Sequence, residues 1–311
     1  MTATIFIDGA VGTTGLEIRD RLAGRTDLTI ALLPDDRRKD ASARREALND
    51  ADFVILCLPD DAAREAVALI DNRRTRVIDA SSAHRVAAGW TYGFPELPGQ
   101  AERIAAATRV ANPGCYPTGF LALVAPLVTA GLIPADLPLS VNAASGYSGG
   151  GKAMIAEFEA GTPGTPVTAF RAYALGLAHK HIAEMTRHAG LTHAPIFAPA
   201  VANTYRGMVV EVPLHLHALP GRPSLAAIED VLRTAFDDCK LVSVATGDTG
   251  AIEIEENAGT DRLTLRVCGN DAVGHARLVA TLDNLGKGAG GAAVQNLNIM
   301  AGVDPVAGLV F

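Results

Sequence analysis

Apolar runs alternate with helix-like spacing along the first third of the chain. Strands are predicted where apolar residues are continuous, at 3–8, 28–33, 51–59, 75–81 and 108–114. Segments 13–24 and 61–71 repeat apolar residues at helical spacing, and an apolar helix is predicted after Cys115. Continuous apolar strands separated by amphipathic helices are typical of a parallel sheet with helices on both faces. The first unit is therefore predicted to be an α/β domain.

The pattern changes at about residue 138. Helical spacing is found at 178–190 and 224–238. Strand character is found at 137–145, 194–218, 251–256 and 262–269, and the last segment, 276–302, contains a strand and a final helix. Longer strands with fewer helices predict a second, α+β domain, whose sheet is mixed and mostly antiparallel.

Composition and charge argue against several classes of protein. A chain of 311 residues is long enough for two domains, and 49% hydrophobic with 20% charged residues is typical of a soluble folded protein. The net charge of −7, without a long basic run, argues against nucleic-acid binding. The sequence has no apolar run of 18 residues and no basic start followed by a cleavage signal, so neither a membrane span nor a secretory peptide is predicted.

Cysteine usage indicates the redox compartment. The 4 cysteines form no C-x-x-C pair and no zinc-ligand spacing with histidine. We therefore expect a cytoplasmic protein with free thiols and no metal.

The sequence DGAVGTTG places Gly9, Gly12 and Gly15 between the first strand and the first helix. This G-x-x-G-x-x-G spacing is related to the dinucleotide fingerprint G-x-G-x-x-G of Rossmann domains. Glycine is needed because the backbone turns sharply and approaches a pyrophosphate, which the free N–H groups of the helix start then bind. Thr13 and Thr14 can add hydroxyl donors. The loop predicts a Rossmann-type domain that binds a dinucleotide.

The sequence LLPDDRRKD after the second strand bears on the choice between NAD and NADP. An NAD site uses an acidic side chain here to hold the ribose 2′-hydroxyl, and Asp35 and Asp36 offer one. Arg37 and Arg38 offer instead the positive charge that binds a 2′-phosphate. The two arginines favour NADP(H) as the cofactor.

Cys115 stands between a Pro-Gly turn and the apolar segment 120–131, at the start of a predicted helix. A helix N-terminus favours an anion and so lowers the pKa of a thiol. An ordinary thiol of pKa ~8.5 is only about 3% thiolate at pH 7, and a shift of about two units corresponds to about 2.7 kcal/mol. A helix end alone rarely supplies that much, so a partner such as histidine is expected.

The remaining cysteines and histidines are weighed against ordinary structural positions. Burial is expected for Cys57 and Cys268, and a position near a helix end for Cys239. Surface positions are expected for His84, His188, His193 and His275, and an ordinary sheet face for His215 and His217, which lack a third metal ligand. His179 and His181 open a predicted helix and point in different directions, and Glu184 can orient His181. Spacing alone does not choose between these two histidines.

Motifs along nearly the whole chain now carry a family resemblance. They are, in order, DGAVGTTG, DASSAHRV, YGFPEL, ANPGCYPT, SGYSGGGK, AHKHIAEM, NTYRGM and KGAGGAAVQNLNIMAG. With them the sequence resembles the N-acetyl-γ-glutamyl-phosphate reductase family, in its shorter form, within the semialdehyde dehydrogenases. NPGCYPT and GGAAVQNLNIM are the specific motifs, whereas the glycine loop is not.

The resemblance implies a reaction of arginine biosynthesis. NADPH would reduce N-acetylglutamyl 5-phosphate to N-acetylglutamate 5-semialdehyde, with release of phosphate. The resemblance makes Cys115 the nucleophile that forms a thioester, His181 the acid/base residue and Glu184 its partner. The family's H-x-H motif often continues with a proline before the acid, whereas this chain has Ile182 and Ala183 there. This departure bears on the local geometry and not on the role of His181.

The same resemblance implies contacts and domain bounds. Ser148 and Gly149 would lie against the cofactor, and Asn296 near the nicotinamide. Substrate contacts are implied for Ser82, Arg85, Asn112, Tyr205 and Arg206, with Arg85 or Arg206 holding the phosphate. Residues 1–115, completed by a helix at about 286–311, would bind NADP(H). Residues 116–285 would form the catalytic and oligomerisation domain of a homodimer or homotetramer.

Other interpretations remain. Aspartate-β-semialdehyde dehydrogenase shares the chemistry and the layout, although NPGCYPT and VQNLNIM favour the first family. A related acyl phosphate, such as aminoadipyl phosphate, would need only a different pocket. A non-catalytic NADP-binding redox sensor would often need a resolving cysteine, and none lies near Cys115 in the sequence. Lys152, at a helix start, fits a surface position and a phosphate contact equally well.

Overall fold

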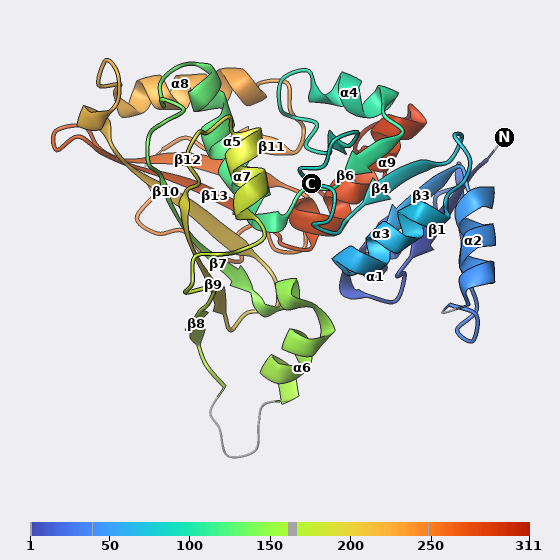
Figure 1. Cartoon of the computed structure of the whole chain (residues 1–311). Helices are drawn as coiled ribbons and strands as arrows, with labels where there is room; N and C mark the ends of the chain where they lie inside the picture. Colours follow the sequence, from blue (N-terminus) through green and yellow to red (C-terminus); the bar gives the residue numbers. More distant parts are fainter. Residues whose placement is uncertain (1, 39, 161–166, 248) are drawn as a thin grey trace. The chain divides into compact units, whose positions relative to one another are not determined.

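The computed structural model describes residues 2–38, 40–160, 167–247 and 249–311. Two compact units make up the chain (Figure 1). The first comprises Met1–Pro95, Gly99–Gly114 and Ala289–Leu309, and the second comprises Glu96–Pro98, Cys115–Gly288 and Val310–Phe311. The chain thus enters the second unit at Cys115 and returns to the first at Ala289.

The first unit is built on a parallel sheet. Its strands are β1 (Ala3–Asp8), β2 (Leu28–Ala31), β3 (Phe53–Leu56), β4 (Arg76–Asp79), β5 (Thr91–Tyr92) and β6 (Arg109–Ala111). They lie in the order β2-β1-β3-β4-β6-β5, and every neighbouring pair is parallel. The predicted Rossmann-type sheet is confirmed, with the order reversing between β1 and β3.

Two apolar clusters cover the two faces of this sheet. The helices of the unit are α1 (Thr13–Leu22), α2 (Ala41–Asp50), α3 (Asp60–Leu69), α4 (Gln100–Ala106) and α9 (Gly291–Ala301). Because side chains alternate along a strand, β1 directs Ile5 and Ile7 to one face, where they join a cluster with α1 and α9. Phe6 points to the other face and packs with α2 and α3. Sequence patterning did not predict α2, because only Ala43 and Leu48 of that helix are buried.

The second unit is built on a mixed sheet. Its strands are β7 (Ser140–Gly146), β8 (Phe170–Ala172), β9 (Ile196–Ala202), β10 (Met208–His215), β11 (Val242–Val244), β12 (Leu263–Asn270) and β13 (His275–Leu282). They lie in the order β11-β12-β13-β10-β7-β9-β8. The pairs β11·β12 and β7·β9 are parallel and the remaining pairs are antiparallel. The prediction of a mixed, mostly antiparallel sheet is confirmed.

An apolar helix packs on one face of this mixed sheet. Helix α5 (Cys115–Thr129) contacts β10, β12 and β13, and its side chains are buried from Tyr116 through Leu127. Helix α8 (Leu225–Phe236) packs beside it on β11 and β12, and α7 (Ile182–His188) packs against α5. The unit is completed by α6 (Gly151–Ala160) (Figure 1). Across the ranges that the structure describes, no helix is both long and apolar enough to cross a membrane.

Three local predictions were wrong. Segment 251–256 is not a strand but loop and turn, and its polar residue Glu256 pairs with Arg266 of β12 instead of joining a ladder. The helix predicted from residue 178 begins at Ile182, because the backbone N–H of His181 is bonded to the His179 side chain. His217 lies in a short 3₁₀ helix after β10 and not on the strand.

Candidate active site

Cys115 is the first residue of α5, and its thiol is partly buried and forms no disulfide. The backbone of Gly288 lies against it, since a Cβ added to Gly288 would be 2.8 Å from the Cys115 Cβ. No side chain fits at Gly288 without moving Cys115. Cys115 thus lies at a helix start, as predicted, and the backbone of Gly288 limits the space around it.

Two tyrosines lie beside this thiol. The Tyr173 hydroxyl donates to the Tyr116 hydroxyl at 3.2 Å, and the Tyr116 hydroxyl donates to the Ala200 carbonyl at 3.1 Å. Burial raises the pKa of Tyr173 to about 12, and the charge of Cys115 acts in the same direction. Burial likewise raises the pKa of Tyr116, with further contributions from Tyr173 and Cys115. Both phenols are therefore neutral hydrogen-bonding groups at physiological pH.

His181 lies next to this tyrosine pair. Its ring centroid is 5.8 Å from that of Tyr116, and its Nε2 is 4.0 Å from Oε1 of Glu184. Both side chains are buried, His181 at 7% and Glu184 at 1% exposure. A buried carboxylate beside an imidazole stabilises the protonated ring and fixes its orientation. The structure therefore brings His181, Glu184 and the residue that follows Cys115 into one cluster.

His179 supports the position of His181 from the other side. Its Nδ1 accepts a hydrogen bond of 3.1 Å from the backbone N–H of His181. Its ring packs edge-on against Tyr116, Tyr173 and Phe197. This contact holds the backbone at the start of α7 against the His179 ring.

Arg206 and Asp283 form a second part of the same unit. Arg206 Nη1 is 3.2 Å from Oδ2 of the fully buried Asp283, and the guanidinium lies over the ring of Tyr205. The Asp283 carboxylate also accepts from the Gly259 N–H at 2.6 Å. Its backbone carbonyl accepts from the N–H of Gly288, the residue in contact with Cys115. Arg206 is thus tied through Asp283 to the backbone beside the thiol.

The SGYSGGGK segment contacts the same residues. The Ser148 N–H donates to the Tyr205 carbonyl at 3.1 Å, and its buried hydroxyl accepts from Asn284 Nδ2 at 2.9 Å. A Cβ on Gly149 would lie 3.4 Å from that same Asn284 nitrogen. Lys152 is exposed near the start of α6. Of the predicted residues of this unit, Ser148, Gly149, Tyr205 and Arg206 are therefore brought together.

The glycine loop of the first unit has the geometry that its sequence predicts. Gly9 has φ +88°, and a Cβ there would lie 2.3 Å from the Cys57 carbonyl oxygen. A Cβ on Gly15 would lie 2.5 Å from the Gly9 carbonyl oxygen. The Gly12 N–H closes the turn on Gly9 at 2.9 Å, and α1 begins at Thr13. The loop therefore offers a bare backbone and a helix start, which fit a dinucleotide pyrophosphate.

A cavity of about 550 Å³ lies beside this loop. Its lining includes Gly9, Asp35, Arg38 and Arg44, but not Arg37. Arg38 is 41% exposed and lies 3.1 Å from Asp35, whereas Arg44 is largely buried and lies 2.7 Å from Asp8. Among the two arginines proposed for a 2′-phosphate, Arg38 is thus the one that lines the cavity.

Asn112 and Asn296 meet within the first unit. Asn296 Nδ2 donates to the Gly93 carbonyl at 2.9 Å and to Asn112 Oδ1 at 3.1 Å, while its Oδ1 is buried without a hydrogen-bond partner. Arg85, which is 9% exposed, donates from Nε to the Asn112 carbonyl at 3.0 Å and from Nη2 to the Ala80 carbonyl at 3.2 Å. This arginine therefore fixes the backbone three residues before Cys115.

The DASSAHR motif contains a second polar cluster. Ser82 bonds through its N–H and its hydroxyl to Asp60 at the start of α3. His84 does not lie on the surface as expected: its ring is stacked on Trp90, and its Nδ1 is 2.6 Å from the buried carboxylate of Asp79. The apolar partner and the carboxylate explain its burial.

Cys57 and Cys268, which were expected to be buried, are only partly buried, and Cys57 and Cys239 have the properties of structural side chains. Burial raises the pKa of Cys57 to about 12 and that of Cys239 to about 11, so neither thiol is reactive at neutral pH. His275 stands 5.0 Å from His215, ring to ring. Even so, no cluster of three or more His, Cys, Asp and Glu in the described part of the chain could hold a metal ion.

Sequence reasoning missed several residues of these clusters. Asp283, Asn284, Tyr173 and Arg44 were not proposed. Two of them had a signal: Asp283 and Asn284 are adjacent polar residues directly after the apolar β13, where a buried strand ends. Tyr173 and Arg44 had none, because their partners lie far away in the sequence.

Comparisons with known proteins agree with this arrangement. Residues 33–107 match the family described as semialdehyde dehydrogenase, NAD binding domain, and residues 115–284 match semialdehyde dehydrogenase, dimerisation domain. A Pseudomonas putida protein named N-acetyl-gamma-glutamyl-phosphate reductase 2 is 50% identical over 307 residues, with 97% of both chains covered. A Brucella anthropi protein named N-acetyl-gamma-glutamyl-phosphate reductase is 52% identical over 309 residues, covering 97% of this chain and 99% of its own. The chain belongs to the N-acetyl-gamma-glutamyl-phosphate reductases of the semialdehyde dehydrogenase family. The predicted family, and with it an oxidoreductase with a nicotinamide-dinucleotide domain, is confirmed.

Solved structures show the same fold in more distant proteins. Aspartate semialdehyde dehydrogenase II from Vibrio cholerae superposes with a TM-score of 0.74 at 15% identity, covering 97% of this chain and 98% of its own. A probable aspartate-semialdehyde dehydrogenase from Pseudomonas aeruginosa gives 0.73 at 18% identity, covering 97% and 99%. The rival family thus shares the fold, and the sequence identities separate the two.

Proposed function

We propose that this protein catalyses the NADPH-dependent reduction of N-acetyl-L-glutamyl 5-phosphate to N-acetyl-L-glutamate 5-semialdehyde, with release of phosphate, in arginine biosynthesis. One observation carries the proposal: a partly buried thiol that forms no disulfide opens an apolar helix, and a buried His181–Glu184 pair lies beside the residue that follows it. The proposal places the reaction in the cytoplasm, where thiols are kept reduced.

Cys115 is the nucleophile. Its thiolate attacks the acyl carbon of the substrate, so that a C–S bond forms and the C–O bond to phosphate breaks. Phosphate leaves with the electron pair, and an acyl thioester remains on Cys115. The neighbouring phenols of Tyr116 and Tyr173 stay neutral and so do not compete as anions.

His181 handles the proton. Its imidazolium stabilises the thiolate before attack and shares its proton with the oxyanion that forms at the acyl carbon. When the C–S bond breaks, the electron pair returns to sulfur and the carbonyl of the aldehyde forms. Glu184 keeps the ring oriented through its contact with Nε2.

Arg206 holds the phosphate. Its side chain is 26% exposed and is anchored by Asp283, and the planar guanidinium matches the geometry of phosphate oxygens. Arg85 is less suited, because it is 9% exposed and donates to backbone carbonyls. We assign Arg85, with Ser82 and Asn112, to shaping the loop before Cys115.

The first unit holds the cofactor. When bound, NADPH supplies the hydride that reduces the thioester carbon. Gly9, Gly12 and Gly15 would carry the pyrophosphate with Thr13 and Thr14, and Arg38 would face the 2′-phosphate. Asn296 would accept from the nicotinamide amide through its buried Oδ1.

The reverse reaction of the wild-type enzyme tests the proposal. With N-acetylglutamate semialdehyde, NADP and phosphate, we expect NADPH absorbance to appear, and to require phosphate. A response to aspartate semialdehyde instead would keep the chemistry and move the substrate to the rival family. If neither aldehyde gave an increase in NADPH absorbance although NADP binds, the assigned reaction would be wrong.

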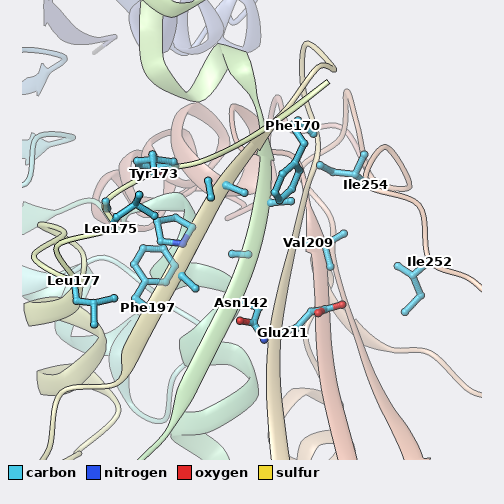
Figure 2. A pocket seen from close by; sticks show the side chains of 18 residues that line it. Asn142, Phe170, Tyr173, Leu175, Leu177, Phe197, Val209, Glu211, Ile252 and Ile254 are labelled. Atoms are coloured by element: carbon cyan, nitrogen blue, oxygen red, sulfur yellow. The ribbon is translucent and has the colours of Figure 1, made fainter. Parts of the chain in front are cut away.

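We propose that the protein works as a homodimer through the face of the mixed sheet opposite α5. A hollow of about 750 Å³ lies there, lined by apolar residues of β7, β8, β9 and β10 and of the segment after β8 (Figure 2). Leu175 is 81% exposed and Phe170 59%. Exposed apolar patches of this kind mark interaction sites, and the matched family describes this unit as a dimerisation domain.

Leu175→Asp is expected to weaken the dimer by at least about 10²-fold, because it buries a charge in an apolar interface. Light scattering during size-exclusion chromatography over a concentration series measures this change. Val273→Asp is the control: Val273 is 56% exposed in the β12–β13 turn, away from the hollow, and should leave the mass unchanged. If the dimer dissociation constant of Leu175→Asp equalled that of wild type, the interface would lie elsewhere.

A further inference from the structure

A buried ion pair of the second unit includes Lys287 of the glycine-rich turn 286–290, where the chain returns to the first unit. Lys287 Nζ is 2.7 Å from Oε1 of Glu96, and the two side chains are 1% and 6% exposed. The mechanism above uses neither residue. Yet removing both charges from water is costly, and apolar side chains of similar volume are often at least as stable in such places. Stability alone therefore does not explain why an ion pair occupies this buried position.

Backbone hydrogen bonds hold part of the turn that carries Lys287: the Gly288 N–H donates to the Asp283 carbonyl at 2.9 Å, and the Ala289 carbonyl accepts from Asn112 Nδ2 at 3.0 Å. The turn is a π-helical turn, Gly286–Gly290, with the sequence GKGAG, placed directly before α9. Glycine is the residue with the greatest backbone freedom, and Lys287 is the one long side chain among these five residues. Single π-helical turns are rare and are frequent at functional sites. The contact with Glu96 thus ties the long side chain of this turn to a buried carboxylate.

The anchored turn is the backbone that touches Cys115. A Cβ on Gly288 would lie 2.8 Å from the Cys115 Cβ, 3.0 Å from the Asp283 carbonyl oxygen and 3.3 Å from the Cys115 Cα. The Gly288 N–H also donates to that carbonyl at 2.9 Å. A shift of the turn would therefore press on Cys115 or release it.

We propose that Lys287 and Glu96 form a positioning pair, which fixes the 286–290 turn against Cys115 and so sets the position of the thiol. The inference rests on the proposed function in one respect, the role of Cys115 as nucleophile. The pair does not touch the reacting atoms; it acts through Gly288. A buried pair with one defined geometry suits this task, because fixing register is the best-attested use of such groups.

Two variants separate positioning from stability. Lys287→Met removes the positive charge that faces the buried Glu96 carboxylate, so we expect a lower Tm, a kcat reduced 10- to 100-fold and a KM within about threefold of wild type. In the double variant Glu96→Leu/Lys287→Met neither charge remains, so Tm should recover while kcat stays at least 10-fold low. A double variant with wild-type kcat would show that the pair is only structural and would overturn the proposal.

The rate of Cys115 alkylation by iodoacetamide, followed by peptide mass spectrometry, is measured on the same proteins. We expect it to change at least threefold in both variants, and an unchanged rate with unchanged kcat would overturn the proposal. This rate needs no substrate, so a wild-type enzyme that fails to reduce the proposed substrate refutes the reaction but not the positioning.

Two further variants complete the experiment. Glu96→Asp keeps both charges and draws the carboxylate back by one methylene, so kcat should fall several-fold. This variant provides the test if Lys287→Met does not fold. Arg21→Met breaks another buried pair, with Glu17 at 2.7 Å on α1, and should lower Tm but keep kcat within twofold. An equal loss of kcat in Arg21→Met would mean that any buried pair has this effect, against the proposal.

Discussion

Cys115→Ser is expected to lower kcat by about 10³-fold or more in both directions of the reaction. A hydroxyl at the start of α5 keeps the shape of the side chain. Its much higher pKa, however, leaves almost no anion at neutral pH, and an ester forms more slowly and accepts hydride less readily than a thioester. NADPH absorbance measures kcat, and mass spectrometry of the protein incubated with substrate detects the acyl group on wild type alone.

Cys268→Ser is the matched control for this variant. Cys268 is a free cysteine in β12, paired in register with Arg277, and it belongs to neither of the clusters described around the thiol. Its activity should stay within twofold of wild type. If Cys115→Ser kept a tenth or more of the wild-type rate, the covalent mechanism would be wrong, and the conserved fold would have to act through direct hydride transfer to the acyl phosphate.

His181→Asn is expected to lower kcat by 10²- to 10⁴-fold, the usual range for loss of a general acid/base. Asparagine fills part of the space of the ring, but its amide can neither donate and accept a proton as an acid/base group nor become positively charged. The pH dependence of Cys115 alkylation gives an independent measure. If His181 acts as proposed, its imidazolium favours the thiolate of Cys115 in wild type, so alkylation should already be fast at neutral pH. In the variant the rate should rise only towards the pKa of an ordinary thiol, ~8.5.

The exposed His193 supplies the control, and His193→Asn should leave both the rate and the alkylation profile unchanged. Glu184→Gln keeps the shape of the buried partner and removes its charge, so it should give an intermediate loss of about 10-fold. An alkylation profile that is the same in His181→Asn and wild type would show that the thiolate does not depend on this imidazole. The helix N-terminus would then be its main support.

The sequence predicted the elements whose cause is local. Ile5, Phe6 and Ile7 are consecutive apolar residues, and a strand with both faces buried requires such a run. Gly9 and Gly15 were recognised by their spacing between a strand and a helix, and the structure shows that a Cβ at either position would meet the backbone. Cys115 was recognised because a Pro-Gly turn precedes it and an apolar run follows it, which places it at the start of a helix. In each case the physical requirement lies within a few residues of the position that meets it.

The wrong predictions have a different cause. Segment 251–256 alternates like a strand, but Glu256 is held by Arg266 and Thr281 of the neighbouring strands, and no strand pairs with its backbone. His84 was placed on the surface because its sequence setting is that of a loop or a helix surface, yet its ring stacks on Trp90 and bonds to Asp79. Tertiary partners overrode the local pattern at these positions.

From its residues alone, the sequence determined the parallel-sheet unit, the dinucleotide loop, the mixed sheet and the candidate nucleophile. Only the tertiary structure decided which side chains assist it. Asp283 meets Arg206 across 77 residues and Lys287 meets Glu96 across 191, while Arg38 and not Arg37 lines the cavity beside the glycine loop. The physical reason is that a single charged or polar residue is compatible with many partners. Burial in a packed unit removes water as the alternative, and the partner that the fold brings within hydrogen-bonding distance is then the one that remains.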